Sequence, residues 1–231
     1  MSTIDVLVPV HDATRPLERC VSSVLSSTEA DVRVLVIAHN VPEDEVRRAL
    51  GGLATDQRVQ VSPLGDGCRG PSTPKNHGLS LATADFVSFV DSDDTLEPGA
   101  LDRWLRIALA QQADFVVGNQ QEPDGSSATS PPVRIGRRNR LRADKDRLAY
   151  RAAVRGLMRR ESLGHLRFPV GVPTGEDISF SARVWFSNAR VSFAFGSPGY
   201  VLHDDQSERA TTTVRPVVES LLWLEPVLEP T

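Results

Sequence analysis

Apolar and polar residues follow two periods along the chain, one typical of strands and the other of helices. Short apolar runs, several of them rich in β-branched residues, predict buried strands at 4–10, 32–38, 58–62, 85–90 and 114–118. Apolar residues at helical spacing predict the intervening helices, at Leu17–Leu25, 43–53, 74–82 and 98–112. This alternation predicts an α/β fold whose mostly parallel central sheet is covered by helices on both faces.

The second half of the chain carries a weaker pattern. Residues 119–132 (NQQEPDGSSATSPP) predict a mobile loop, and the basic segment after it is predicted to be helical from Asp144 to Arg160. Two late strands are expected at 192–195 and 199–203. Residues 214–224 predict a helix whose apolar side chains cover the core, with a partner subunit or a membrane surface as the alternatives.

The composition is that of an ordinary globular protein. Of the 231 residues, 40% are hydrophobic and 24% are charged, and the net charge is −4. This suits one large domain, with or without a small appendage. Cys20 and Cys68 are too few for a disulfide framework and are interpreted as reduced thiols. Because the first ten residues do not resemble a leader and no stretch approaches ~20 apolar residues, a cytoplasmic location is expected, with the inner face of the membrane as an alternative.

Positive charge is concentrated in one segment. Residues 134–160 contain eleven Lys and Arg against two Asp, a net charge of +9, so that the rest of the chain carries −13. Such an asymmetry can mark an anionic partner. A solvated basic helix explains it equally well, because a basic run without a motif specifies little.

Three carboxylates follow the predicted strand at 85–90. Asp91, Asp93 and Asp94 are close enough to raise one another's pKa unless a cation neutralises them. In an extended strand end Asp91 and Asp93 would share a side. Oxygen ligands suit Mg²⁺ or Mn²⁺, and ligands of α/β sheets bind beyond the carboxyl ends of strands. A metal site is favoured over the alternative, a solvated acidic turn in which Asp94 caps the next helix.

Glu176 and Asp177 precede a second helical pattern. Acidic residues in the first turn of a helix are favoured by its dipole, which explains the pair without any catalytic role. The functional interpretation makes one of them a general base for a hydroxyl group. Spacing alone favours the first interpretation.

The order of these segments resembles the family-two glycosyltransferases, which have the GT-A fold. The resemblance covers most of residues 4–186, through VLVPVHDATRPLERCVSSVLSS, GPSTPKNHGLSLATADFVSFVDSDD and RFPVGVPTGEDISFSARVWF. The middle segment is the most specific. Its Pro74-Lys-Asn-x-Gly78 is similar to the family's Ala-Arg-Asn-x-Gly, at the usual distance before the Asp-x-Asp strand.

The resemblance implies an inverting transfer of a sugar from a nucleotide diphosphate donor to a hydroxyl acceptor. Asp177 would be the base, and Glu176 would contact the acceptor or shape the site. Mn²⁺ or Mg²⁺ would be held by Asp91 and above all Asp93, with His203 as a further ligand. The residues expected around the donor are Pro9, Val10, His11, His39, Asn40, Lys75, Asn76, Ser92 and Arg209. His203 and Arg209 would belong to a loop that closes over the donor phosphates.

The resemblance also implies an organisation and a partner. A GT-A domain is expected at residues 1–211, with a donor half at about 1–118 and an acceptor half at about 140–211, followed by a C-terminal helix and tail at 212–231. The acceptor would belong to cell-envelope polysaccharide. Because the basic segment precedes the Glu-Asp pair, which faces the acceptor in this family, the acceptor could be an anionic or lipid-linked glycan. No nucleic-acid partner is expected. A peripheral membrane or protein partner is an alternative.

One segment departs from the family pattern. After its second strand the family usually has Asp-Asp-Gly-Ser, whose first acid accepts a hydrogen bond from uracil, whereas this chain has Ile37-Ala-His-Asn40. His39 or Asn40 can accept the same bond. UDP remains the first expectation, with dTDP or GDP as alternatives. The departure also leaves open a catalytically degenerate module that acts as a binding or assembly partner. A nucleotidyltransferase is disfavoured, because residues 10–16 (VHDATRP) lack a glycine-rich phosphate loop.

Overall fold

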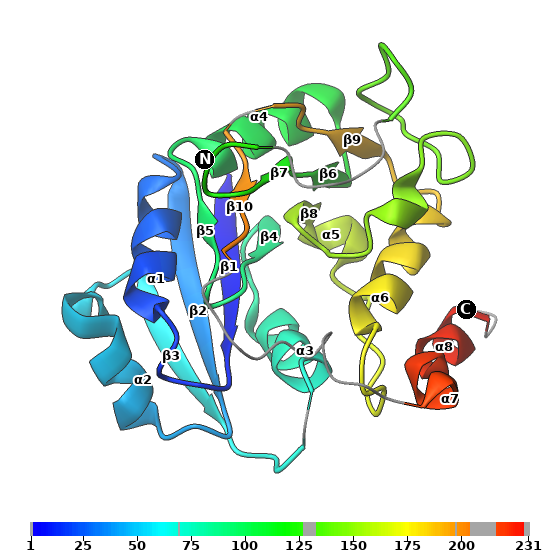
Figure 1. Ribbon diagram of the computed structural model, residues 1–231. Coiled ribbons are helices and arrows are strands. Elements are labelled where there is room, and N and C mark those ends of the chain that lie inside the picture. Colours follow the sequence, from blue (N-terminus) through cyan, green and yellow to red (C-terminus); the bar gives the residue numbers. More distant parts are fainter. Residues whose placement is uncertain (1, 69, 127–132, 197, 204–215, 229–231) are drawn as a thin grey trace.

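The computed structural model describes residues 2–68, 70–126, 133–196, 198–203 and 216–228, and a seven-stranded sheet forms its centre (Figure 1). The strands lie in the order β3-β2-β1-β4-β8-β6-β9. All neighbours are parallel except β8, which is antiparallel to both β4 and β6. The bounds are β1 Thr3–Val10, β2 Asp31–His39, β3 Val59–Leu64, β4 Phe86–Phe89, β6 Phe115–Val117, β8 Gly156–Arg159 and β9 Val191–Phe193.

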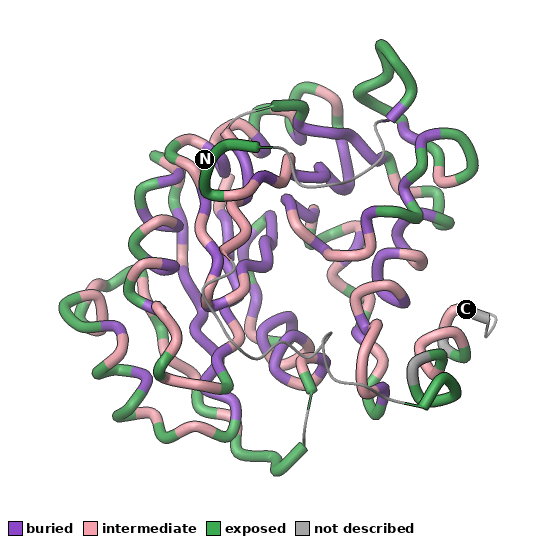
Figure 2. The backbone as a smooth tube through the Cα atoms, in the orientation of Figure 1, coloured by how far each residue is buried: buried purple, intermediate pink, exposed green. Residues whose placement is uncertain are grey.

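Helices cover both faces of this sheet, as the alternating pattern predicts. Val6, Val8 and Val10 of β1 pack with α1, α2 and α4, whereas Leu7 packs on the opposite face with α3 and α6. Figure 2 shows the buried strands between the more exposed outer segments. The helices are α1 Leu17–Ser26, α2 Glu43–Leu50, α3 Ser72–Leu81, α4 Ala100–Gln111, α5 Arg160–Leu163, α6 Glu176–Trp185, α7 Val217–Ser220 and α8 Glu225–Leu228.

Shorter elements complete the fold. A three-stranded sheet has the order β5-β10-β7, with β5 Thr95–Leu96, β7 Gln120–Gln121 and β10 Tyr200–Val201. The 3-10 turns η1, η2 and η4 of the described residues lie at Gly51–Thr55, Leu148–Tyr150 and Leu222–Leu224. Cys20 and Cys68 are both free. Within the described ranges, no helix has the length and apolar character needed to cross a bilayer.

The helix predicted from Asp144 to Arg160 is wrong. Turns, the short η2 and irregular backbone occupy residues 144–155, and β8 follows between β4 and β6. Asp146 is fully buried, and its carboxylate accepts hydrogen bonds from the side chain of Arg134 and the backbone N–H of Arg142. A buried carboxylate that binds nearby backbone and side-chain donors competes with helix formation. Because the many Arg residues of this segment suggested a solvated helix, this arrangement was not predicted from the sequence.

Strand β8 also joins the two expected halves of the chain. It comes from the expected acceptor half, yet it pairs with β4 and β6 of the expected donor half.

In the C-terminal tail, Trp223 packs on Gly175 at the start of α6, and its carbonyl accepts a hydrogen bond from Ser179. In place of the single helix predicted over 214–224, the described residues form the short α7 and η4, and residues 214–215 lie outside the described part. The η4 turn covers α6, while Val217 and Val218 of α7 remain exposed.

Gly156 is the position where β8 depends most on a glycine. Its φ is +145°, and an added Cβ would lie 2.0 Å from the Val116 carbonyl oxygen. We predict that Gly156→Ala lowers the free energy of unfolding by about 3 kcal/mol, measured by urea denaturation. Gly52→Ala is the matched control, because nothing lies within 4 Å of that position. Equal stability of the two variants would contradict the prediction.

Candidate functional site

A cavity of about 410 Å³ opens at the carboxyl ends of β1 and β2. The carboxyl ends of neighbouring parallel strands meet at one edge of a sheet, so residues far apart in sequence converge there. The segment before α3 and its first turn close the other side through Cys68, Gly70, Pro71 and Pro74. Five residues that the sequence singles out as donor-binding therefore line one cavity: Pro9, Val10, His11, His39 and Asn40.

Hydrogen bonds distinguish His39 from Asn40. The Asn40 amide donates to the Cys68 carbonyl (2.9 Å) and accepts from the Gly67 N–H (3.0 Å), so it is committed to holding the loop. The His39 Nε2 lies 2.9 Å from the Asp66 carboxylate. The Asn40 amide nitrogen lies 3.1 Å from the same Nε2, and in the tautomer in which Nε2 donates to Asp66, Nδ1 is the acceptor. His39 is thus better suited than Asn40 to accept a hydrogen bond from a ligand.

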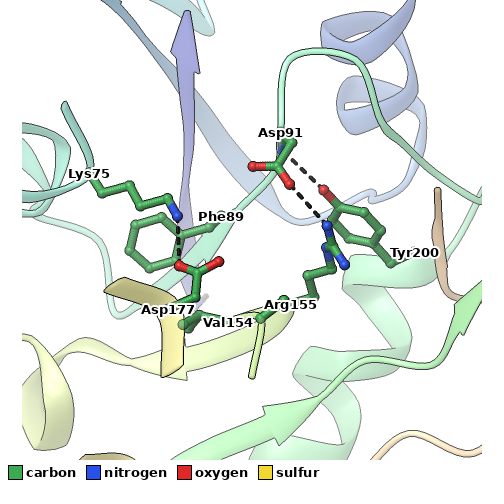
Figure 3. A pocket seen from close by; sticks show the side chains of 8 residues that line it. Lys75, Phe89, Asp91, Val154, Arg155, Asp177 and Tyr200 are labelled. Atoms are coloured by element: carbon green, nitrogen blue, oxygen red, sulfur yellow. Dashed lines mark hydrogen bonds and ion pairs between the residues drawn. The ribbon is translucent and has the colours of Figure 1, made fainter. Parts of the chain in front are cut away.

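Lys75 connects α3 to the first turn of α6 through two ion pairs, and Figure 3 shows the one with Asp177. Its Nζ lies 2.6 Å from Asp177 Oδ1 and 2.9 Å from Glu176 Oε1. Burial alone would lower the pKa of Lys75, but Asp177, Glu176 and Asp91 raise it above its usual value. Burial raises the pKa of Asp177, and Lys75 offsets only part of that rise. Asp177 is therefore a stronger base than an exposed carboxylate.

The acidic turn after β4 lies across a small cavity from this cluster. The cavity has a volume of about 10 Å³, and its polar lining consists of Lys75, Asp91, Arg155, Asp177 and Tyr200. Figure 3 shows the Lys75–Asp177 pair on one side and the Asp91–Arg155 pair on the other. A space of that size holds about one water molecule. The two charge clusters therefore face each other with little solvent between them.

The expectation that Asp91 and Asp93 share a side of an extended strand end is wrong. The chain turns at this point, since the Asp94 N–H donates to the Asp91 carbonyl at 3.0 Å. Asp91 pairs with Arg155 at 3.1 Å, whereas Asp93 pairs with Arg15 at 3.0 Å. The turn directs the two carboxylates to different cations.

The pKa values of Asp94 and Asp91 shift in opposite directions. Burial, followed by the charge of Asp91, raises the pKa of Asp94 to about 6, although the N–H of His203 donates to its carboxylate. Burial also acts on Asp91, but Arg155 and Lys75 outweigh it and lower the Asp91 pKa. The close acids behave as the sequence predicts, with Arg155 as the cation that keeps Asp91 ionised.

The carboxylates fit a metal only in part. No group of three or more His, Cys, Asp or Glu in the described part of the chain could hold a metal ion by itself. Mg²⁺ is commonly bound by one or two carboxylates together with substrate phosphates. Asp93 and the 45% exposed Asp91 are the carboxylates available for a metal shared with a diphosphate, although each is paired with a different arginine. His203, the third expected ligand, lies beside the turn with its Nε2 2.9 Å from Thr95 Oγ1.

The other predicted donor-site residues have different surroundings. Both ends of the Asn76 amide bind the backbone of Phe168, so Asn76, which was expected around the donor, holds the segment before α6 and is not among the residues that line the cavity. Ser92 is buried in the acidic turn, and its hydroxyl has no hydrogen-bond partner among the described residues. Arg209 lies outside the described residues.

Sequence reasoning missed Arg155 and Tyr200. Arg155 bonds to Asp91 and lies over the Tyr200 ring at 4.9 Å, and the Tyr200 hydroxyl accepts from the Asp91 N–H at 3.0 Å. Arg155 was counted in the basic segment that predicted a solvated helix. The glycine and apolar residues directly after it, at 156–158, were the signal for a buried strand.

A family model described as Glycosyl transferase family 2 matches residues 5–167. The glycosyltransferase GlyG of Streptococcus pneumoniae serotype 4 is 25% identical over 123 residues, 53% of this chain and 40% of that protein. The poly(ribitol-phosphate) β-N-acetylglucosaminyltransferase TarP of Staphylococcus aureus is 23% identical over 215 residues, 89% of this chain and 64% of TarP. The chain thus spans less than two thirds of the length of either relative.

Solved structures show the same fold. The crystal structure of S. aureus TarS 1–349 in complex with UDP-GlcNAc superposes with a TM-score of 0.80. The sequence identity is 19%, and the match covers 96% of this chain and 67% of that one. A similarity at this level of identity establishes the arrangement of the elements.

Lys75→Met would leave the buried carboxylate of Glu176 and the partly buried carboxylate of Asp177 without their cation. We predict a loss of about 3–5 kcal/mol in the free energy of unfolding near neutral pH, measured by urea denaturation. The matched control is Lys75→Met combined with Glu176→Gln and Asp177→Asn, which removes the charges together and should recover most of the stability. If the triple variant is no more stable than Lys75→Met, the loss has another cause.

The raised pKa of Asp94 predicts a pH-dependent stability. A carboxyl whose folded pKa is about 6 contributes stability below its unfolded pKa and loses it as the pH rises through about 6. Asp94→Asn removes this titration while keeping an oxygen that accepts from the His203 N–H. The melting temperature of the variant relative to the wild type should therefore be higher at about pH 8 than at about pH 4.5. A difference that does not change with pH would contradict the assignment.

Proposed function

The chain belongs to glycosyl transferase family 2, and from this membership we propose that it moves a sugar from a nucleoside diphosphate donor to an acceptor hydroxyl group. The fold is the GT-A fold of such enzymes. One observation carries the proposal: α3 lines the donor-sized cavity with Pro74 and, one residue later, binds the candidate base Asp177 with Lys75. A donor in the cavity would lie beside the base.

We assign donor binding to residues 1–118 and acceptor binding to about 140–211, with UDP as the donor nucleotide. The TarS complexes contain UDP-GlcNAc and UDP. His39, with Nε2 held by Asp66, offers Nδ1 to the imide N–H of a uracil ring. The His39 ring would thus take the role of the carboxylate that the family usually has after its second strand.

Asp91 and Asp93 would hold Mg²⁺ or Mn²⁺ together with the donor's diphosphate. When bound, such an ion supplies positive charge that stabilises the leaving diphosphate. Arg15, 3.0 Å from Asp93, would add to that positive charge from the protein. His203 and Arg209 are assigned to the same side of the donor.

The protein's own part in the reaction centres on Asp177. Its carboxylate takes the proton of the acceptor hydroxyl while the oxygen attacks the anomeric carbon and the bond to the diphosphate breaks on the opposite face. Lys75 orients that carboxylate at 2.6 Å and keeps it ionised. Glu176 shares the lysine and shapes the acceptor side. Inversion at the anomeric carbon follows from a single displacement.

The acceptor we propose is an anionic glycan of the cell envelope. TarP is named for poly(ribitol-phosphate), and a second relative from Bacillus spizizenii for the same polymer. The net charge of +9 over residues 134–160 suits a chain of phosphates. We place the reaction in the cytoplasm, at the inner face of the membrane where such an acceptor would be lipid-linked.

A thermal-shift panel tests the donor site. UDP, dTDP, GDP and CDP are each added with Mn²⁺ or with EDTA to the wild type and to Asp93→Ala. We expect UDP with Mn²⁺ to stabilise the wild type by about 2.7 kcal/mol at a hundredfold excess over Kd, and Asp93→Ala much less. If no nucleotide shifts the melting temperature, the donor site is degenerate and the chain is a binding module.

Asp177→Asn tests the catalytic assignment separately. The variant should bind UDP as the wild type does, because Asp177 faces the acceptor side, but its transfer rate should fall by about 10²–10⁴. The comparison needs transfer assays with UDP-sugars beside the thermal shifts. Full activity of Asp177→Asn would contradict its role as the base.

A further inference from the structure

A second pocket, with a volume of about 610 Å³, lies outside the site described above. Its two walls are residues 140–144, in the basic segment, and 185–190, at the C-terminal end of α6. Glu176 and Asp177 occupy the other end of the same helix. The charged and aromatic residues of the lining are Arg140, Arg142, Asp144, Trp185, Phe186 and Arg190.

The basic wall has a fixed backbone. The Leu141 N–H donates to the Val191 carbonyl, and the Phe193 N–H donates to the Arg138 carbonyl, both at 2.9 Å, so the segment lies along β9. The buried Asp146 holds the following turn through Arg134 and the Arg142 N–H. Figure 1 shows this segment beside β9. The pocket is therefore formed before any ligand arrives.

Positive charge in the pocket exceeds what its own acids neutralise. Arg142 pairs with Asp144 at 3.0 Å, and Arg190 pairs with Asp114 at 3.4 Å outside the pocket. No carboxylate among the described residues pairs with Arg140. Arg140 is exposed, and its backbone φ of +48° lies outside the values of regular helices and strands. Phe186 adds an aromatic surface and is 72% exposed. Cations beside an exposed ring suit a ligand that carries both phosphates and carbon-rich units.

We propose that this pocket binds a phosphate-bearing glycan or polyol chain, as a second contact for the acceptor. The inference rests on the proposed transfer to an anionic glycan. With a rise of 1.5 Å per residue, Asp177 and Phe186 are roughly 14 Å apart along α6. A chain of several repeats spans both places, whereas a short acceptor reaches only the base. The hollow between two segments fits a chain better than it fits a flat lipid surface.

The test measures binding without a donor. Fluorescently labelled glycerol phosphate chains, a dimer and an oligomer long enough to reach both places, are titrated into the wild type and into Arg140→Ser combined with Phe186→Ser. Both side chains are exposed and outside the active site, so the variant should fold normally. Arg106→Ser is the control, because it removes an exposed arginine from α4, which contributes nothing to this pocket.

We expect the double variant to bind the long oligomer about tenfold more weakly, with the dimer and the Arg106→Ser control unchanged. The loss should shrink as salt is added, because exposed charges are screened. In transfer assays, KM for the long oligomer should rise while kcat stays the same. Unchanged binding of the long oligomer, or an equal loss for both lengths, would overturn the proposal.

Two further outcomes separate this inference from the proposed function. If sugar transfer occurs but the double variant binds the long oligomer normally, only the second pocket is refuted. If no donor supports transfer to either the dimer or the long oligomer, the proposed function is refuted. Vesicles containing phosphatidylglycerol serve as a competing probe. If the double variant loses binding to vesicles but not to the oligomer, the pocket is a membrane contact and the proposal is wrong.

Discussion

Four carboxyl groups gather at one edge of the central sheet, two of them largely buried, and their mutual repulsion requires cations in fixed places. Lys75 neutralises Glu176 and Asp177, and Arg155 lies 3.1 Å from Asp91 and 3.6 Å from Asp94. A buried carboxylate without a partner is costly, so each cation constrains the element that carries it. Lys75 ties α3 to α6, and Arg155 ties the start of β8 to the turn after β4. The candidate catalytic groups are thus placed by the same interactions that close the fold around them.

The positions of these ion pairs suit the proposed chemistry. The Lys75–Asp177 pair keeps a base of raised pKa oriented, while the Asp91–Arg155 pair holds a second carboxylate ionised across a cavity of about 10 Å³. The larger cavity at the ends of β1 and β2 adjoins this cluster through α3. Donor and acceptor would therefore meet where the protein already holds opposite charges in place with little water.

Local patterns were sufficient to predict much of this structure. The strands over 4–10 and 32–38 are confirmed because their apolar runs are long and β-branched, and the cavity residues at their ends follow from strand order. The segment 144–160 was mispredicted because its fold depends on the buried Asp146 and on a glycine that only β8 requires. The partners of Asp91 and Asp93 could not be predicted, since Arg155 and Arg15 approach them from distant parts of the chain. The roles of Asp177 and His39 remain proposals.

The most direct test of the central claim is the anomeric configuration of the product. A single displacement assisted by Asp177 requires that a sugar α-linked to UDP become β-linked in the acceptor, which the proton coupling constant at the anomeric carbon distinguishes by NMR. The account predicts a β-linked product from the wild type and almost none from Asp177→Asn. An α-linked product would contradict the assignment of Asp177 as the base of an inverting transfer.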